Sequence, residues 1–179
     1  METPDAGQNI ITRGLPKTGQ VVEYQGGDDG TYEAGWWKGR LNANNRERWI
    51  AKTIGGDDIV LDRAAGLMWA ADRNAAGCNN GAGIAWGAAI TYANGLTFAG
   101  FTDWRLPNIK ELVSLVNYSL LSPTIDQPPF VSTLATGYWS STTFIVTTTS
   151  AWLTNFSDGS LYILAKTSEK PIRCVRKGV

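Results

Sequence analysis

Two short runs limit most strongly what this chain can fold into. They are residues 100–112, with the sequence GFTDWRLPNIKEL, and residues 138–142, with the sequence YWSST. Each joins a bulky aromatic residue to small polar residues and a turn or helix-cap signal, a mixture that fits neither a simple helix face nor an alternating strand. We therefore expect a domain rich in loops that buried tryptophans hold in place.

The chain has 179 residues, enough for one domain with a hydrophobic core, and eight of them are tryptophans. Trp buries a large area, and its indole N–H needs a hydrogen-bond partner. We predict that Asp103, Trp104 and Arg105 form a buried network in which the Asp103 carboxylate accepts hydrogen bonds from backbone N–H groups or from Arg105. Trp139 is predicted to fill the core, and alternation along the strand then turns Ser140 outward.

Composition excludes several classes of protein. The 16 basic and 16 acidic residues balance, whereas a general nucleic-acid binder carries a basic excess. The chain lacks histidine, the usual general base near neutral pH, so Ser-His-Asp and Cys-His catalysis are excluded within it. Its apolar runs are too short to span a bilayer. We predict no nucleic-acid partner, membrane insertion, metal or cofactor, while carboxylate or lysine chemistry stays open on composition alone.

The two cysteines, Cys78 and Cys174, lie far apart in the sequence. A disulfide between them would close a loop of roughly a hundred residues and stabilise the fold by on the order of 4 kcal/mol. We expect this bridge because the rest of the composition is typical of an extracytoplasmic protein. The alternative is a pair of unlinked thiols.

Residues 1–56 differ from the rest in being rich in Gly, Asn and charge. We expect them to form an N-terminal extension that packs on a domain of residues 57–179. Trp36 and Trp37 are expected to anchor this extension, the alternative being an exposed binding patch. The first residues lack a signal-peptide core, which fits either a cytoplasmic protein or a mature secreted form, and we expect the mature form.

Two charged segments have alternative interpretations. Asp28 and Asp29 precede Gly30 in a tight-turn signal, and the alternative is that they offer two carboxylates to a calcium ion. Near the C-terminus, basic residues are predicted to lie on a solvated edge strand, the alternative being an anion-binding patch. The basic residues are Lys166, Lys170, Arg173, Arg176 and Lys177.

The order of predicted elements indicates an α+β domain. Apolar residues at 86, 89, 90 and 93 have helical spacing, and Asn108 with Glu111 forms a capping box that begins a second helix. Asn94 and Gly95 end the first helix. Short apolar or alternating runs predict strands. They are residues 59–61, 67–69, 138–142, 151–156, 160–164 and 172–176.

An ordered set of short motifs resembles the C-terminal domain of the bacterial collagen-like adhesins, the Lcl C-terminal domain family. The resemblance runs from about residue 15 to residue 176. The motifs are LPKTGQ at 15–20, DDG at 28–30, GLMW at 66–69, DWRLPN at 103–108, EL at 111–112, YWSST at 138–142 and RCVR at 173–176.

The resemblance implies a C-type-lectin-like fold, with two helices, a twisted antiparallel sheet and long loops. It also implies a secreted or cell-surface module without catalysis, often a trimer, that binds carbohydrate, in some members sulfated glycans. Ligands of such folds meet the loops between the late strands. The ligand-binding candidates here are Trp152, Asn155, Asp158 and Tyr162, with the segment 143–150.

Two other functions stay open on the sequence. The lectin-like scaffold could be a protein–protein assembly module without sugar binding, with Trp36 and Trp37 as its contact. An enzyme similar to the formylglycine-generating proteins would need a reactive cysteine pair. Cys78 and Cys174 supply two sulfurs, but the residues around them do not match that pattern.

Overall fold

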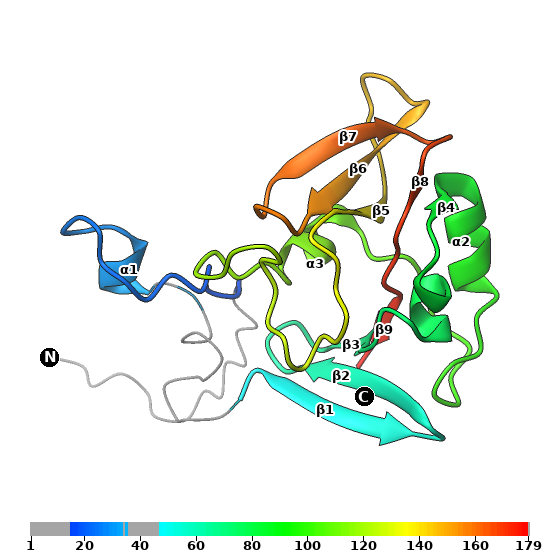
Figure 1. Cartoon of the computed structure of the whole chain (residues 1–179), viewed down its shortest axis with the longest axis horizontal. Helices are drawn as coiled ribbons and strands as arrows, with labels where there is room; N and C mark the ends of the chain where they lie inside the picture. Colours follow the sequence, from blue (N-terminus) through cyan, green and yellow to red (C-terminus); the bar gives the residue numbers. More distant parts are fainter. Residues whose placement is uncertain (1–14, 34, 36–46, 179) are drawn as a thin grey trace, which may run out of the picture.

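Antiparallel sheets carry the fold in this computed structural model, which describes residues 15–33, 35 and 47–178 (Figure 1). The largest sheet has the strand order β1 (Trp49–Ile54), β2 (Asp57–Asp62), β3 (Leu67–Ala70) and β9 (Val175–Lys177). A second sheet has the order β5 (Gly137–Thr143), β6 (Ser150–Asn155) and β7 (Leu161–Ala165). The short strands β4 (Ile84–Ala85) and β8 (Glu169–Lys170) pair with each other in a third, two-stranded sheet.

Helices are few and short, so the predicted α+β class is confirmed. They are α1 (Asp29–Tyr32), α2 (Trp86–Asn94) and α3 (Ile109–Val113), with a 3-10 segment at Ala76–Gly81. The predicted capping box of α3 forms, because Asn108 Oδ1 accepts from the Glu111 N–H and Glu111 Oε2 accepts from the Asn108 N–H. Helix α2 buries Ala89 and Ala93 completely, as its apolar spacing predicted.

Strand β1 was not predicted from the sequence. It pairs with β2 over its whole length, from Trp49 opposite Asp62 to Ile54 opposite Asp57. The boundary expected after residue 56 therefore falls in a hairpin turn, where Gly55 and Gly56 adopt positive φ angles of 63° and 93°. Only Trp49 is buried in β1. Because the middle of the strand is exposed, its residues do not alternate between apolar and polar as a half-buried strand would.

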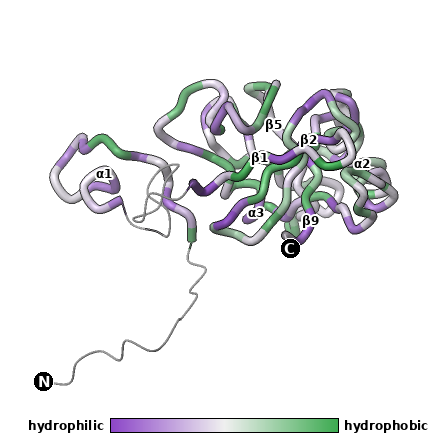
Figure 2. The backbone as a smooth tube through the Cα atoms, turned by 90° about the horizontal axis from the view of Figure 1, so that it is seen from below, coloured by the Kyte–Doolittle hydropathy of each residue, from purple (hydrophilic) through white to green (hydrophobic). Residues whose placement is uncertain are grey.

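Residues 15–33 lie to one side of the sheets in both views (Figures 1 and 2). A backbone hydrogen bond joins this segment to the domain, since the Thr18 carbonyl accepts from the Tyr118 N–H at 2.9 Å. Asp28 caps α1 and accepts hydrogen bonds from the N–H groups of Tyr24 and Thr31. A short helix therefore begins where a tight turn was predicted, while Trp36 and Trp37 lie outside the described residues.

Two hydrophobic clusters make the core, and the same strands contribute side chains to both. Consecutive residues of β3 belong to different clusters, since Met68 lies in the first cluster and Trp69 in the second. In β5, Trp139 joins the first and Tyr138 the second. Because side chains alternate along a strand, the sheets lie between the clusters.

Asp103, Trp104 and Arg105 do not form one network. Trp104 is buried, and its indole N–H donates to the Phe98 carbonyl at 2.8 Å. The expected pairing of Asp103 with Arg105 is wrong, because Arg176 Nε donates to Asp103 Oδ1 at 2.6 Å. Arg105 instead makes two hydrogen bonds, of 2.6 and 2.7 Å, to the Glu111 carboxylate.

The Arg105 guanidinium changes the acidity of its partner in α3. Burial alone would raise the pKa of Glu111, but the hydrogen bonds from Arg105 and from the Asn108 N–H outweigh burial and lower that pKa. The capping carboxylate of Glu111 therefore stays charged and joins the start of α3 to Arg105.

The prediction of a solvated basic C-terminal strand is wrong for two of its five residues. Arg173 is completely buried, and Arg176 is 8% exposed. Arg173 donates to the Ala70 and Ala71 carbonyls and to Thr133 Oγ1, and its guanidinium lies 5.1 Å from the centre of the Phe130 ring. Carbonyl oxygens and an aromatic ring thus stabilise the buried charge of Arg173, which the sequence pattern had predicted to be solvated.

The expected disulfide is absent, because Cys78 and Cys174 are free and buried thiols. The chain does bring them into one region, since the Cys174 N–H donates to the Gly77 carbonyl at 2.9 Å. Both belong to the first hydrophobic cluster, where a thiol packs as a small apolar group. Burial raises the pKa of each thiol, which disfavours the reactive thiolate.

These thiols should be inert in the native chain. We expect a thiol reagent such as Ellman's reagent to modify neither cysteine within minutes under native conditions, because the thiolate is rare and the sulfurs are covered. The same reagent should count two thiols per chain after denaturation without reductant. A denatured count of zero would show that the cysteines are bridged, and fast native reaction would contradict their burial.

Candidate functional site

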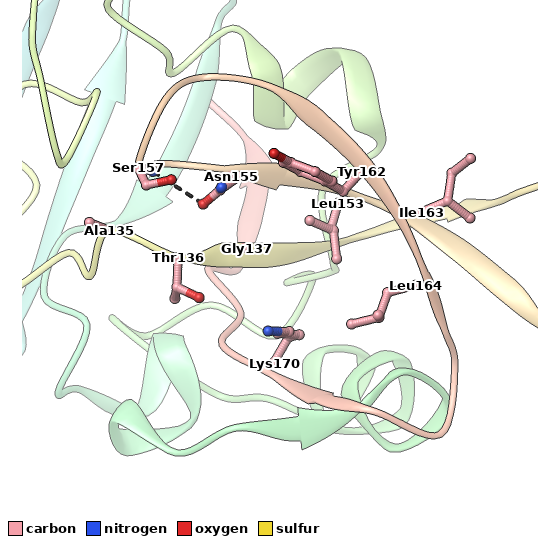
Figure 3. A pocket seen from close by; sticks show the side chains of 10 residues that line it. All are labelled: Ala135, Thr136, Gly137, Leu153, Asn155, Ser157, Tyr162, Ile163, Leu164 and Lys170. Atoms are coloured by element: carbon pink, nitrogen blue, oxygen red, sulfur yellow. Dashed lines mark hydrogen bonds between the residues drawn. The ribbon is translucent and has the colours of Figure 1, made fainter.

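A pocket of about 310 Å³ opens on one face of the β5–β6–β7 sheet; we refer to it as the β5–β7 pocket (Figure 3). Residues from all three strands, the two adjoining turns and β8 line it. They are Ala135, Thr136, Gly137, Leu153, Asn155, Ser157, Tyr162, Ile163, Leu164 and Lys170. The lining mixes aliphatic, aromatic, amide, hydroxyl and cationic groups, as the binding sites of polar organic molecules do.

Strand register puts these side chains on one face. Leu153 lies opposite Tyr162, and Gly137 lies opposite Asn155, so each pair shares a face of the sheet. At Gly137 the absence of a side chain matters, because a Cβ there would come within 2.6 Å of Leu153 Cδ1. Figure 3 shows Leu153, Leu164, Thr136 and Lys170 around the opening, with Ile163 pointing away.

The polar end of the pocket is built by the β6–β7 turn. Asn155 Oδ1 accepts from the Ser157 N–H at 3.2 Å. Asp158 accepts from the N–H and hydroxyl of Ser160, and the Tyr162 hydroxyl donates to Asp158 Oδ2 at 3.4 Å. The Ser160 hydroxyl and N–H lower the pKa of Asp158, so this carboxylate stays charged and helps to orient the phenol ring.

Lys170 is not among the four ligand candidates; it belongs to the basic residues whose alternative interpretation was an anion-binding patch. Strand β8 places it at the pocket by pairing Lys170 with Ile84, and β8 has only two residues, too few to form a recognisable pattern. Within residues 15–33, 35 and 47–178 as described, no carboxylate forms an ion pair with Lys170. An unpaired ammonium at the rim of a pocket favours an anionic group on a ligand.

The four ligand candidates do not all converge. Asn155 and Tyr162 line the pocket, and Asp158 reaches it through its hydrogen bond to Tyr162. Trp152 lies on the opposite face of β6, where its ring meets Phe144 edge-on at 5.4 Å. The sequence could have predicted this, because Trp152 and Asn155 are three positions apart, and residues at an odd spacing along a strand lie on opposite faces.

Ser140 also differs from its prediction. It is completely buried, and its hydroxyl donates to the Trp152 carbonyl at 2.6 Å. The register of β5 against β6 shifts between Trp139 and Thr143, which marks a bulge and breaks simple alternation. Both faces of β5 are covered, because Tyr138 and Trp139 are buried in different clusters, so facing away from Trp139 does not expose a residue.

A second hollow, of about 370 Å³, lies between β1 and the segment around Pro128 and Pro129. Two of its polar side chains are paired with each other, since Thr53 Oγ1 donates to Asp58 Oδ1 at 2.6 Å. It contains none of the predicted ligand residues. The β5–β7 pocket is therefore the stronger candidate for ligand recognition.

The described residues do not gather three or more Asp, Glu or Cys side chains in a metal-binding arrangement. Among those same residues, no helix has the length and apolar character needed to cross a membrane.

Comparison with known proteins gives one family match. Residues 58–176 match the family model described as the Lcl C-terminal domain. The match spans β2 to β9 and includes every residue of the β5–β7 pocket. Comparison with curated proteins gave no match.

Proposed function

Because this chain belongs to the Lcl C-terminal domain family, we propose that it is a non-enzymatic recognition module that binds carbohydrate in the β5–β7 pocket. The family is that of surface, adhesin-type domains. Secretion to the cell surface, with sulfated glycan as the ligand, is the finer form of the proposal. A C-type-lectin-like scaffold is part of it, supported by the antiparallel sheets and by β1 and β9 lying in one sheet.

The composition of the β5–β7 pocket is the observation that carries the proposal. A sugar ring presents an apolar face that stacks on an aromatic ring, and hydroxyls that need hydrogen-bond partners around it. Tyr162 is 48% exposed and offers such a ring. Asn155 and Thr136 offer amide and hydroxyl groups, and the unpaired Lys170 suits a sulfate or carboxylate on the sugar.

We expect Tyr162→Ala to weaken the binding of a sulfated polysaccharide by about tenfold, because it removes a stacking surface worth about 1–1.5 kcal/mol. Lys170→Gln should weaken it by a similar factor and should also reduce the dependence of the affinity on salt. Isothermal titration calorimetry of the full chain with a sulfated polysaccharide and its desulfated form measures both effects. Lys170→Gln should leave binding of the desulfated form unchanged.

Tyr32→Ala is the matched control, because Tyr32 is a 71% exposed tyrosine in α1, outside the pocket. Trp152→Ala tests the opposite face of β6 and should leave the affinity unchanged in chains that melt normally. Equal losses in Tyr162→Ala and Tyr32→Ala would place the binding site elsewhere. If neither polysaccharide binds, protein–protein assembly becomes the better explanation, favoured by Ile145 and Val146, which are 84% and 79% exposed.

A further inference from the structure

Gly137 in β5 directs both of its backbone hydrogen-bonding groups away from β6. It lies opposite Asn155 in the β5–β6 pair. The Asn155 N–H donates to the Ser160 carbonyl at 2.9 Å, and the Asn155 carbonyl accepts from the Gly159 N–H at 2.8 Å. Because both groups of Asn155 bond on the β7 side, this pair is of the non-hydrogen-bonded type, and the Gly137 N–H and C=O point outward from β5.

The Gly137 groups point toward the β5–β7 pocket. N–H groups two residues apart along a strand point the same way, and the Trp139 N–H donates to the Pro171 carbonyl, next to β8, at 3.0 Å. The Gly137 N–H and C=O therefore face the β8 side, where Lys170 lines the same pocket. Figure 3 shows Gly137 between Asn155 and Lys170.

These groups have no partner in the part of the chain that the structure describes. The Gly137 N–H and C=O make no hydrogen bond there, although Gly137 is buried. The preceding residue is different, because the Thr136 N–H donates to the Leu134 carbonyl and the Thr136 carbonyl accepts from the Phe156 N–H. A buried peptide group without a partner is uncommon in native proteins, because it loses hydration without a replacement. The pocket wall thus offers a ligand one donor and one acceptor, side by side.

An apolar surface adjoins this donor and acceptor. A Cβ at Gly137 would lie 2.6 Å from Leu153 Cδ1, so the Leu153 side chain lies next to the Gly137 backbone. Leu164 lines the same pocket (Figure 3). A ligand hydroxyl against the leucines would lose hydration, whereas a methyl group there buries apolar area. The ligand group that fits Gly137 therefore combines a hydrogen-bond acceptor with a methyl group.

We propose that the β5–β7 pocket recognises an anionic sugar that carries an acetamido group. The amide carbonyl of the sugar accepts from the Gly137 N–H, and a neighbouring ring hydroxyl donates to the Gly137 carbonyl. Because the amide oxygen and the methyl group share one carbon atom, this hydrogen bond sets the methyl group against Leu153 and Leu164. The anionic group lies at Lys170. This inference rests on the proposed carbohydrate function and names the class of sugar that the pocket selects.

Calorimetry of the full chain with modified chondroitin 6-sulfate tests this selection, because alternate sugars of that polymer carry both an acetamido group and a sulfate. Replacing the acetyl groups with N-sulfate should weaken binding by at least about tenfold, since it removes the methyl contact and sets a charged group against the leucines. Attraction by charge alone predicts tighter binding instead. A sample that is re-acetylated after the same deacetylation is the control and should bind as the untreated polymer does.

Nuclear magnetic resonance of the isotope-labelled chain identifies the atoms involved. The Gly137 amide resonance should shift when a short fragment of the N-acetylated polymer binds, and it should shift much less with the N-sulfated fragment. Gly87 is the matched control. It is an exposed glycine in the first turn of α2, where its N–H has no helical acceptor, and it does not line the pocket. Its resonance should stay in place.

Leu164→Ser should weaken binding of the N-acetylated polymer by about fourfold, the contribution of one buried methyl group, and leave binding of the N-sulfated polymer unchanged. Ile163→Ser is the matched control, because Ile163 is the neighbouring residue of β7 and points away from the pocket (Figure 3). It should keep the full preference for the N-acetylated polymer.

The outcomes separate this inference from the proposed function. Equal binding of the N-acetylated and N-sulfated polymers would overturn acetamido recognition and leave carbohydrate binding in place. If the untreated, N-sulfated and re-acetylated polymers all fail to bind, the proposed function and this inference fall together. A Gly137 resonance that stays in place on binding, or that shifts only with an N-acetylated dipeptide, would exclude the acetamido sugar as the partner of Gly137.

Discussion

Replacing Asp62 with alanine is expected to destabilise the fold by about 3–5 kcal/mol, because it leaves the positive charge of Arg48 buried without its partner. The side chains of Arg48 and Asp62 are 6% and 0% exposed. Arg48 Nε and Nη2 donate to the two Asp62 oxygens at 3.1 and 2.8 Å. Asp62 Oδ1 also accepts from the N–H groups of Ala64 and Ala65, so the β2–β3 turn loses its acceptor as well.

Chemical denaturation followed by circular dichroism measures this loss, which is a large share of the 5–15 kcal/mol that stabilises a typical domain, as an order of magnitude. The paired replacement Arg48→Met with Asp62→Leu is the matched control. Because it removes both charges together, it should cost much less than Asp62→Ala. If the double variant were as unstable as the single one, the loss would come from packing and not from the unpaired charge.

Trp139→Ala is expected to destabilise the fold by about 3–5 kcal/mol, because it empties a large volume that the surrounding residues cannot fill. Trp139 is completely buried in the first hydrophobic cluster. It also ties three separate segments together. Its indole N–H donates to the Ile84 carbonyl at 3.0 Å, its backbone N–H donates to the Pro171 carbonyl at 3.0 Å, and it lies opposite Leu153 of β6.

Trp139→Phe separates the two contributions of this side chain. It keeps most of the volume and removes the indole donor, so it should cost about 1–3 kcal/mol by leaving the Ile84 carbonyl without that partner. The same denaturation experiment compares the two variants. Equal losses would mean that the hydrogen bond dominates, and a negligible loss in Trp139→Ala would contradict the burial of this residue.

Local signals in the sequence predicted the local structure well. The Asn108–Glu111 capping box begins α3, because its two partners are three residues apart and need no other part of the chain. The β2–β3 hairpin and the β6–β7 hairpin likewise follow from a turn between two short apolar runs. In each case the interacting residues are close neighbours in the sequence.

Partners that are distant in the sequence escaped prediction. Arg176 reaches Asp103 across 73 positions, and Arg173 reaches the Ala70 carbonyl across 103. A basic residue near a chain end has the same local signature whether it meets solvent or the core, so composition could not tell these two cases apart. Only the position of β9 beside β3 decides it.

The candidate site shows the same limit. Asn155 and Tyr162 belong to one hairpin, and the sequence placed them together. Thr136 and Lys170 reach the pocket from the segment before β5 and from β8, and no local pattern linked them to it. Trp152 was attractive as an aromatic residue, but strand alternation outweighs composition and places it on the other face.

The arrangement of the two hydrophobic clusters has a consequence for how the domain comes apart. Met68 and Trp69, like Tyr138 and Trp139, are consecutive residues that belong to different clusters. Loosening either strand to open one cluster exposes the other, so neither half can melt while its neighbour survives. We therefore expect the two clusters to unfold together in one cooperative transition.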